Sequence, residues 1–281
     1  MSNPVQKTVF GFLKATRIPN LLIIAGTQMA TAFFLLNEKV IDVRFLLLVF
    51  STVMIAAAGY IINDYYDQKV DMINRPKSVV VGIEFSRRPA LLTHVFISAM
   101  GILLGFWVDT LVGFIHIFSS SLLWYYSNYL KRLPLIGNMS IGLLSGMSIL
   151  IVLVFFHSVH EIAFIYALFA FLMVFIREVL KDIEDVKGDE AFGIQTIPVI
   201  WGIRGAKIII YLVVISGSAL LLYLLISYQN LILRYYFLGL TPLFIWFIYR
   251  LIKADTMKQF RRLHLFCDTI VFTGLLSLLF H

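Results

Sequence analysis

The sequence contains nine long apolar runs, and each is long enough to cross a lipid bilayer as a helix. A spanning helix needs about 20 predominantly apolar residues. Every backbone polar group inside a bilayer must be paired, and long uncharged runs meet this requirement as helices rather than as a barrel. We therefore expect an all-α, polytopic membrane protein with nine transmembrane helices in one bundle. The expected spans are residues 18–36, 43–63, 90–108, 110–130, 138–157, 161–180, 205–227, 232–251 and 263–280.

The amino-acid composition supports a membrane protein. Hydrophobic residues make up 60% of the 281 residues and charged residues only 14%, whereas soluble domains carry about 25% charged residues. The net charge of +7 does not require a nucleic-acid partner, because membrane proteins concentrate basic residues in cytoplasmic loops. The single cysteine, Cys267, excludes an intrachain disulfide. No soluble domain interrupts the runs, so we expect residues 1–281 to form a single domain.

The distribution of Lys and Arg predicts how the chain is oriented in the membrane. With a cytoplasmic N-terminus and nine alternating spans, twenty of the 23 Lys and Arg residues fall on the cytoplasmic side. Only Lys39, Arg44 and Arg234 fall outside. Because positive charge is retained on the cytoplasmic side, we expect a multi-pass protein of the cell membrane with a cytoplasmic N-terminus and an external C-terminus.

An acidic pattern occurs twice, each time at the cytoplasmic end of an expected span. Three aspartates follow one another at intervals of three and four residues after the second span, and the same spacing returns after the sixth. On a helix that turns about 100° per residue, the three carboxylates of each set lie within about 60° of one another. The two sets are Asp64, Asp67 and Asp71, and Asp182, Asp185 and Asp189.

Carboxylates at the end of a membrane span are costly unless cations lie between them. A solvated acidic loop is the simpler interpretation, but the matching spacing at two places argues against it. Oxygen ligands without His or Cys suit a hard ion such as Mg²⁺, which is often shared with substrate phosphate. We therefore predict a site for Mg²⁺ and a diphosphate in a central cavity open to the cytoplasmic side. The predicted metal ligands are Asn63, Asp64, Asp67, Asp71, Asp182, Asp185 and Asp189.

Helix-ending signals lie close to both acidic sets. Arg75 and Pro76 follow the first set, and Gly188 lies within the second. Such residues usually end a regular helix nearby. We therefore expect Asp71 and Asp189 to lie just beyond their helices.

Several basic residues near the acidic sets are candidates for contacts with phosphate oxygens. Arg offers a bidentate fork for phosphate, and Lys offers a point charge. The bias of positive charge toward the cytoplasm would also explain these residues without any ligand. The candidates for diphosphate binding are Arg17, Arg75, Lys131, Arg132 and Lys181, together with Asn63.

These motifs resemble those of the UbiA superfamily of intramembrane prenyltransferases. Residues 63–71 match the first aspartate-rich pattern of that family without a gap, and residues 74–77 resemble the segment that usually follows it. Residues 182–198 resemble the second pattern, and residues 131–138 look like the basic loop after the fourth span. Nine spans match the family architecture, so the resemblance covers essentially the whole chain.

The resemblance implies a reaction. A polyprenyl diphosphate would lie with its tail in the helix bundle and its head among the aspartates, where Mg²⁺ would bridge carboxylates and diphosphate. The allylic carbon of the donor would become cation-like, and a lipophilic acceptor would attack it. The implied partners are the donor, the acceptor and membrane lipids, with no obligate protein partner. The implied catalytic residues are Asp64, Asp67, Asp182 and Asp185.

The acceptor is suggested by the second motif. Residues 177–185 are similar to the same segment of geranylgeranylglyceryl phosphate geranylgeranyltransferases, which implies transfer of a geranylgeranyl group in ether-lipid synthesis. Those enzymes commonly carry a second basic segment with proline soon after the first, where this chain has Ser-Val-Val-Val-Gly at residues 78–82. An aromatic acceptor on a quinone or pigment pathway therefore stays open as the alternative.

Two other classes of function are compatible with acidic clusters in a membrane protein. A divalent-cation or proton-coupled transporter usually places ionisable groups near the middle of the bilayer. Here the acidic groups gather at the cytoplasmic ends of spans, with Asp109 and Asp268 as the exceptions. A non-catalytic lipid-binding scaffold would not require two matched aspartate sets. Both classes are therefore less consistent with the sequence than a prenyltransferase.

Overall fold

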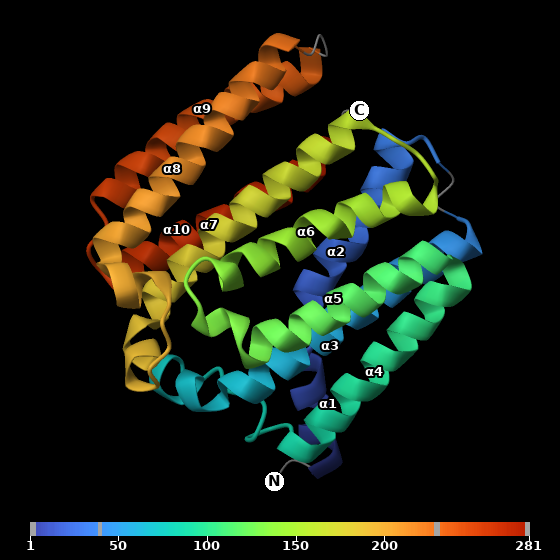
Figure 1. Ribbon diagram of the computed structural model, residues 1–281, viewed down its shortest axis with the longest axis vertical. Coiled ribbons are helices and arrows are strands. Elements are labelled where there is room, and N and C mark those ends of the chain that lie inside the picture. The colour runs from blue at the N-terminus through green and yellow to red at the C-terminus, as the bar shows by residue number, and fades with distance from the viewer. Residues whose placement is uncertain (1–3, 39–40, 228–230, 279–281) are drawn as a thin grey trace. The chain divides into compact units, whose positions relative to one another are not determined.

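The computed structural model describes residues 4–38, 41–227 and 231–278. Within these ranges the chain is helical, and the one strand-like feature is an isolated bridge between Val81 and Phe85, which confirms the all-α class. The α-helices, shown in Figure 1, are α1 Pro4–Ala15, α2 Ile18–Ala30, α3 Val43–Asn74, α4 Arg87–Val108, α5 Thr110–Asn128, α6 Ile136–Phe155, α7 Glu161–Ala191, α8 Ile197–Ser227, α9 Leu231–Ile252 and α10 Met257–Ser277. A π-helical turn, Thr31–Leu35, continues α2, and a 3-10 turn, Leu130–Arg132, precedes α6.

Seven of the described helical segments are long and apolar enough to cross a membrane. The expected spans at residues 110–130 and 263–280 form helices α5 and α10, which are not among the seven. Helix α10 begins with a basic stretch around Arg261 and Arg262, which lowers its apolar character. Lys39 and both ends of the chain lie outside the described residues, so the expected orientation stays a prediction. The seven segments are Ile18–Leu35, Val43–Asn74, Arg87–Val108, Ile136–Phe155, Glu161–Ala191, Ile197–Leu220 and Arg234–Ile252.

The chain divides into two compact units. Unit 1 comprises Met1–Lys131 and Met147–Ala163, and unit 2 comprises Arg132–Gly146 and Phe164–His281. The first acidic set lies on α3 in unit 1, and the second lies on α7 in unit 2.

Unit 1 is built around the long helix α3, which packs against α2, α4 and α5 (Figure 1). Phe45 and Leu48 of α3 are fully buried, in a cluster that includes Val112 of α5. Near the first acidic set, Gly59 lets α5 approach closely, because a Cβ at this position would lie 2.8 Å from a methyl carbon of Leu123. Small residues of this kind permit close helix packing in membranes. Helix α5 therefore packs tightly against α3 at Gly59, just over one turn before Asp64 begins the acidic set.

The loop between α3 and α4 is packed into unit 1 rather than extended into solvent. Val81 and Phe85 of this loop are buried in a cluster with Ala15 at the end of α1. Gly82 has a φ of 93°, and the side chain of Gln68 occupies the place where a Cβ would stand. The segment in which this chain departs from the ether-lipid enzymes thus forms a folded apolar loop.

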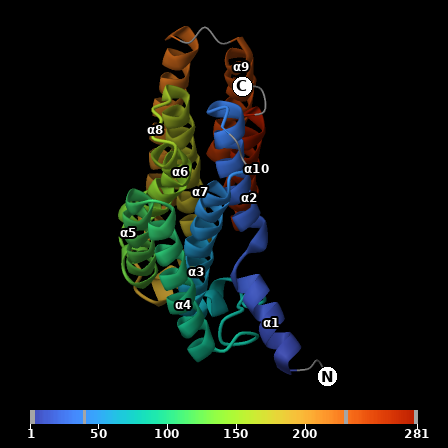
Figure 2. The ribbon, with the colours of Figure 1, turned by 90° about the vertical axis from the view of Figure 1, so that its right-hand side faces the viewer.

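Helices α1 and α2 are joined by a sharp bend in the backbone (Figure 2). Arg17 stands at this bend with a φ of 52° and a ψ of 55°, in the left-handed region. Side chains other than Gly, Asn and Asp rarely take this conformation. The bend fixes the backbone of Arg17, and the backbone in turn determines the direction in which the Arg17 side chain leaves the chain.

Unit 2 contains α7 from Phe164 onward, helices α8 to α10, and the start of α6. Gly146 of α6 lies against α7, where a Cβ would come within 2.9 Å of the carbonyl oxygen of Ala167. Helix α8 is kinked at Gly202, whose φ of 68° and ψ of 171° are not helical. Helix α9 packs against both α8 and α10. Helix α7 with the second acidic set is thus supported by α6 within this unit.

Candidate active site

Both acidic sets lie entirely within helices, which corrects the expectation that Asp71 and Asp189 lie beyond them. Helix α3 continues to Asn74 and α7 continues to Ala191. All three aspartates of each set therefore keep the common helix face that their spacing predicts.

The helix-ending signals act later than expected for identifiable reasons. Pro76 disfavours helical geometry at the residue before it, and Arg75 has a φ of −145° and a ψ of 61°. Gly188 remains helical, since an interior glycine costs only about 1 kcal/mol relative to alanine. Gly193, just beyond α7, takes the left-handed conformation that commonly follows a helix end, with a φ of 64°.

Asp64, the first carboxylate of unit 1, is bonded to Arg17. Arg17 Nη2 donates to Asp64 Oδ1 at 2.7 Å, and the Asp64 side chain is only 13% exposed. The guanidinium of Arg17 also lies 5.1 Å from the ring centroid of Tyr60, one turn before Asp64. Burial lowers the pKa of Arg17, but the charge of Asp64 and the hydrogen bond to it outweigh burial and raise this pKa above its ordinary value. The bend between α1 and α2 thus delivers a permanent positive charge to the first aspartate.

Asp67 is held by two side chains on its two oxygens. Lys131 Nζ lies 2.5 Å from Asp67 Oδ1, and Asn63 Nδ2 donates to Asp67 Oδ2 at 2.8 Å. The carbonyl oxygen Oδ1 of Asn63 is buried and has no hydrogen-bond partner. Buried acceptors are nearly always paired in native proteins. The carbonyl oxygen of Asn63 could therefore accept a bond from a group that is not part of the protein.

Arg75 and Arg132 take part in backbone hydrogen bonds near the acidic sets. The backbone N–H of Arg75 donates to the carbonyl of Asp71 at 2.7 Å, which closes the last turn of α3. Arg132 is exposed, and its carbonyl accepts from the backbone N–H of Gln195 at 3.1 Å. Among the predicted diphosphate residues in unit 1, Arg17, Lys131 and Asn63 thus contact aspartate side chains directly.

In unit 2 the second acidic set is held by residues that precede and follow α7. Asn138, at the start of α6, donates from Nδ2 to Asp182 Oδ2 at 2.7 Å and is itself only 5% exposed. Asp189 is buried and accepts from the Thr196 hydroxyl at 3.1 Å, which ties the end of α7 to the start of α8. Asp185 lies one turn after Asp182 on the same face and is partly exposed.

A second polar cluster lies on α7 and α10. Glu178 is buried and pairs with Arg177 at 2.7 Å and with Lys181 at 3.7 Å. On α10, Asp268 lies 3.3 Å from Arg177 and His264 lies 2.9 Å from Glu184 of α7. Lys181, a predicted diphosphate residue, therefore lies beside a carboxylate of its own helix.

Sequence reasoning did not assign roles to Asn138 or His264. The position of Asn138 was visible only as part of the resemblance, because an asparagine near a helix start is common. The spacing of His264 and Asp268, four residues apart on one helix, was the available signal for α10. Such a pair indicates a shared face but does not reveal which helix it meets.

The donor chemistry of the acidic sets fits a hard divalent cation. Among the described residues, no three His, Cys, Asp or Glu side chains are already placed together so that they could hold a metal ion. The acidic sets nevertheless offer only carboxylate and amide oxygens, which is the donor type that Mg²⁺ prefers. The unpaired Oδ1 of Asn63 adds a neutral oxygen in unit 1. The residues present therefore suit Mg²⁺.

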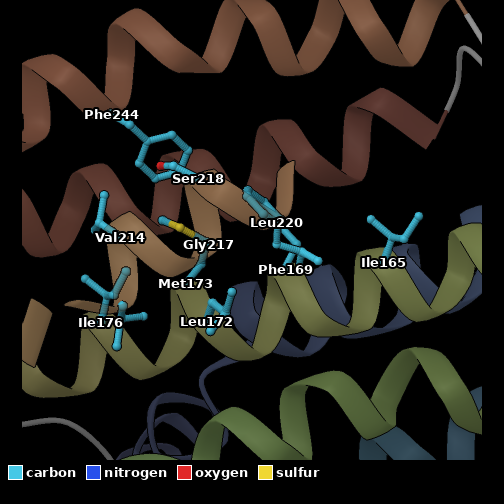
Figure 3. Close-up of a pocket in the computed structure, with 11 residues that line it drawn as sticks. Ile165, Phe169, Leu172, Met173, Ile176, Val214, Gly217, Ser218, Leu220 and Phe244 are labelled. Carbon is cyan, nitrogen blue, oxygen red and sulfur yellow. The ribbon is translucent and has the colours of Figure 1, made fainter. Parts of the chain in front are cut away.

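Unit 2 also contains a small apolar pocket between α7, α8 and α9 (Figure 3). Its volume is about 30 Å³, and its lining includes Met173, Gly217 and Phe244 but none of the predicted site residues. Space of this size holds about two water-sized groups. The pocket as it stands is therefore too small to enclose a prenyl chain.

Comparison with known proteins decides the family. The model of the UbiA prenyltransferase family matches residues 24–270 of this chain. The chain belongs to this family. The membership confirms the resemblance that the two aspartate sets carry, and it agrees with the apolar helices of a multi-pass membrane protein.

Relatives of known name and structure point in the same direction. The chain is 33% identical over 187 residues to the digeranylgeranylglyceryl phosphate synthase of Methanobrevibacter smithii, an alignment that covers 63% of this chain and 66% of the relative. It spans between about half and two thirds of the length of the first three such relatives.

Two solved structures share the fold. A structure described as a digeranylgeranylglyceryl phosphate synthase in membranes superposes with a TM-score of 0.74 at 22% identity, over 96% of this chain and 97% of that chain. A UbiA homologue from Archaeoglobus fulgidus bound to DMAPP and Mg²⁺ superposes with a TM-score of 0.69 at 14% identity, over 94% and 98%.

Proposed function

We propose that this UbiA-family protein is an Mg²⁺-dependent intramembrane prenyltransferase. It transfers a polyprenyl group, specifically geranylgeranyl, from its diphosphate to geranylgeranylglyceryl phosphate, a step of ether-lipid synthesis. The observation that carries the proposal is the group of Asn63, Asp64 and Asp67, in which Arg17 and Lys131 hold the carboxylates and an amide oxygen is buried without a partner.

The donor and metal follow from this chemistry and from relatives. UbiA homologues from Archaeoglobus fulgidus are described in complex with DMAPP and Mg²⁺ and with GPP and Mg²⁺. When bound, the metal ion neutralises the charge that develops on the departing diphosphate. We assign metal binding in this chain to both acidic sets, as the sequence predicts. The assigned ligands are Asn63, Asp64, Asp67, Asp71, Asp182, Asp185 and Asp189.

The basic residues bind the diphosphate in this proposal. Arg17 and Lys131 lie on Asp64 and Asp67, so their charged ends are already at the edge of the acidic set. We propose that they exchange these carboxylates for phosphate oxygens when the donor binds. After the exchange, Arg17 and Lys131 would pair with phosphate oxygens, and Asp64 and Asp67 would pair with the metal ion. No charged group would then be buried without a partner, which would be costly. Arg75, Arg132 and Lys181 are the further candidates for diphosphate contact.

The architecture that we propose is one domain over residues 1–281 with nine spans. With α5 and α10 added to the seven apolar segments, nine spans put the two termini on opposite sides of the membrane. The bias of Lys and Arg supports a cytoplasmic N-terminus and an external C-terminus. The acidic sets then face a cytoplasmic cavity, where a soluble diphosphate product can leave. The apolar helices around it exclude water, which would otherwise hydrolyse the cation-like prenyl group.

The acceptor is proposed from the relatives, several of which are named digeranylgeranylglyceryl phosphate synthase. The test is an assay of the purified protein in lipid nanodiscs with Mg²⁺ and geranylgeranyl diphosphate. Geranylgeranylglyceryl phosphate and a panel of aromatic quinone precursors are offered as acceptors, and products are identified by mass spectrometry. A digeranylgeranyl ether as product supports the proposal. A prenylated aromatic product overturns the acceptor, and absence of any prenyl transfer overturns the enzyme.

A further inference from the structure

Helices α7 and α10 contact each other at four points that follow one antiparallel register. His264 lies on Glu184 and Asp268 lies on Arg177 near the acidic set. Farther along, Gly274 lies beside Phe169, where a Cβ would stand 3.4 Å from the ring. The hydroxyl groups of Tyr166 and Ser277 are 2.7 Å apart at the far end. Each step forward on α10 is matched by a step backward on α7, so α10 follows α7 over most of its length.

The contacts of α10 fall on the side of α7 that is turned away from the acidic set. At about 100° per residue, Glu184 lies about 130° and Arg177 about 110° around the helix from the middle of the acidic set. The three aspartates of the set lie within about 60° of one another. Glu184 lies between Asp182 and Asp185 in sequence but about 100° or more around the helix from either. Helix α10 therefore contacts the side of α7 that is turned away from the three aspartates.

The front of α7 is held independently. Asn138 of α6 donates to Asp182 at 2.7 Å. Within unit 2, α7 is therefore contacted by α6 on the face of the aspartates and by α10 on another face. The His264–Glu184 contact is largely shielded from solvent, with side-chain exposures of 19% and 11%, whereas the contact of Arg177 with Asp268 is more open, at 25% and 45%. Cys267, between His264 and Asp268 on α10, is fully buried. Two polar contacts two turns apart on one face resist rotation of α7 about its own axis more strongly than apolar packing alone, because hydrogen bonds are directional.

We propose that His264 and Asp268 are positioning residues of the prenyl-transfer site. They act through Glu184 and Arg177 and set the rotation of α7, which in turn aims Asp182 and Asp185. The proposal rests on the proposed function, since it takes these aspartates as metal ligands. Residues that orient metal ligands from behind commonly change metal affinity by about 10- to 100-fold when they are replaced.

The test compares His264→Leu with His264→Asn. Leucine removes both ring nitrogens, whereas the asparagine amide keeps a donor near the place of Nδ1. Binding of Mn²⁺, used as a spectroscopic substitute for Mg²⁺, is measured by electron paramagnetic resonance with geranylgeranyl diphosphate present and no acceptor. We expect His264→Leu to weaken Mn²⁺ binding about tenfold and His264→Asn to restore most of it. Asp268→Asn, which keeps the side-chain shape, is expected to weaken binding several-fold.

A matched control and a packing check accompany these variants. Thr269→Ala alters an exposed residue of the same helix, whose hydroxyl donates to the carbonyl of Leu265 in its own helix. This variant should bind Mn²⁺ like the wild type. Protection of Cys267 from maleimide reports whether α10 stays packed. If His264→Leu exposes Cys267, the comparison is made with Asp268→Asn and with His264→Asn instead.

The outcomes separate this proposal from the proposed function. Wild-type Mn²⁺ binding in both His264→Leu and Asp268→Asn, with Cys267 protected, overturns the positioning role even if prenyl transfer is confirmed. If the wild type binds Mn²⁺ and diphosphate without transferring a prenyl group, the proposed function fails, and the Mn²⁺ comparison still decides the role of α10. A wild type that binds no Mn²⁺ overturns both.

Discussion

Arg17 Nη2 lies 2.7 Å from Asp64 Oδ1, which joins the left-handed bend between α1 and α2 to the first carboxylate of α3. The pair links residues 47 positions apart in the sequence. It shows that a basic residue before the first span and an acidic residue at the end of the second occupy one place in unit 1. In the proposed reaction this is where the donor diphosphate meets positive charge.

Replacing Arg17 should impair donor binding without unfolding the chain. Asparagine tolerates the left-handed backbone, so Arg17→Asn removes the charge and keeps the bend. A hydrogen bond to a charged group contributes about 1.5–3 kcal/mol, so we expect kcat/KM for the prenyl diphosphate to fall by about 10- to 100-fold. Lys69→Ala, which removes an exposed positive charge on α3, is the control. Equal loss in both variants would show that only overall charge matters.

Removal of the leading carboxylates should abolish transfer. Asp64→Ala and Asp182→Ala each delete a proposed metal ligand, and we expect turnover in nanodiscs with Mg²⁺ and geranylgeranyl diphosphate to fall by at least about 100-fold. Glu190→Gln, on an exposed position of α7, should retain wild-type turnover. Wild-type rates in both alanine variants would contradict the assignment of the acidic sets.

Metal removal should stop the reaction reversibly. Chelation by EDTA is expected to eliminate product, and excess Mg²⁺ should restore it, because oxygen-only ligand sets bind hard divalent cations. The measurement is product formation before chelation, after chelation and after Mg²⁺ addition in a single preparation. Turnover that persists in EDTA would argue for a reaction without a metal ion.

Asn138 should be needed to hold Asp182. Asn138→Leu leaves the half-buried carboxylate of Asp182 without the donor that Asn138 supplies. An unsatisfied group of this kind costs up to about 1–3 kcal/mol, so the thermal unfolding temperature should fall. Asn138→Asp adds a second carboxylate next to Asp182, and its negative charge attracts a divalent cation, so we expect a lower Mg²⁺ concentration for half-maximal activity than in the wild type. An unchanged Mg²⁺ requirement in Asn138→Asp would show that the contact is only structural.

The packed loop before α4 predicts a stability effect at Gly82. Gly82→Ala places a methyl group where the Gln68 side chain lies, at a φ of 93°, and backbone strain of this kind costs about 1–3 kcal/mol. We expect a lower thermal unfolding temperature. Gly239→Ala is the matched control, since a Cβ there meets no atom within 4 Å and its φ is not positive. Equal unfolding temperatures in the two variants would contradict the packing of this loop.

The sequence predicted well those parts of the site that depend on neighbours in the chain. The shared face of Asp64 and Asp67 follows from a spacing of three residues on a helix, and the structure confirms that α3 is helical there. The helix ends at Asp71 and Asp189 were predicted wrongly. Helix α3 continues to Asn74, two residues before Pro76, and α7 continues through Gly188. Proline and glycine weaken a helix locally, but they do not specify the residue at which its hydrogen bonds stop.

The helical membrane class and the two acidic faces were determined by the sequence itself, because run length and residue spacing are local properties that a helix converts directly into geometry. Only the tertiary structure decided that Lys131 reaches Asp67 across 64 positions and that His264 of α10 lies behind the second acidic set on α7. Such partners depend on how helices far apart in the chain pack against each other. Spacing along one helix carries no information about which side chain from another helix will meet it.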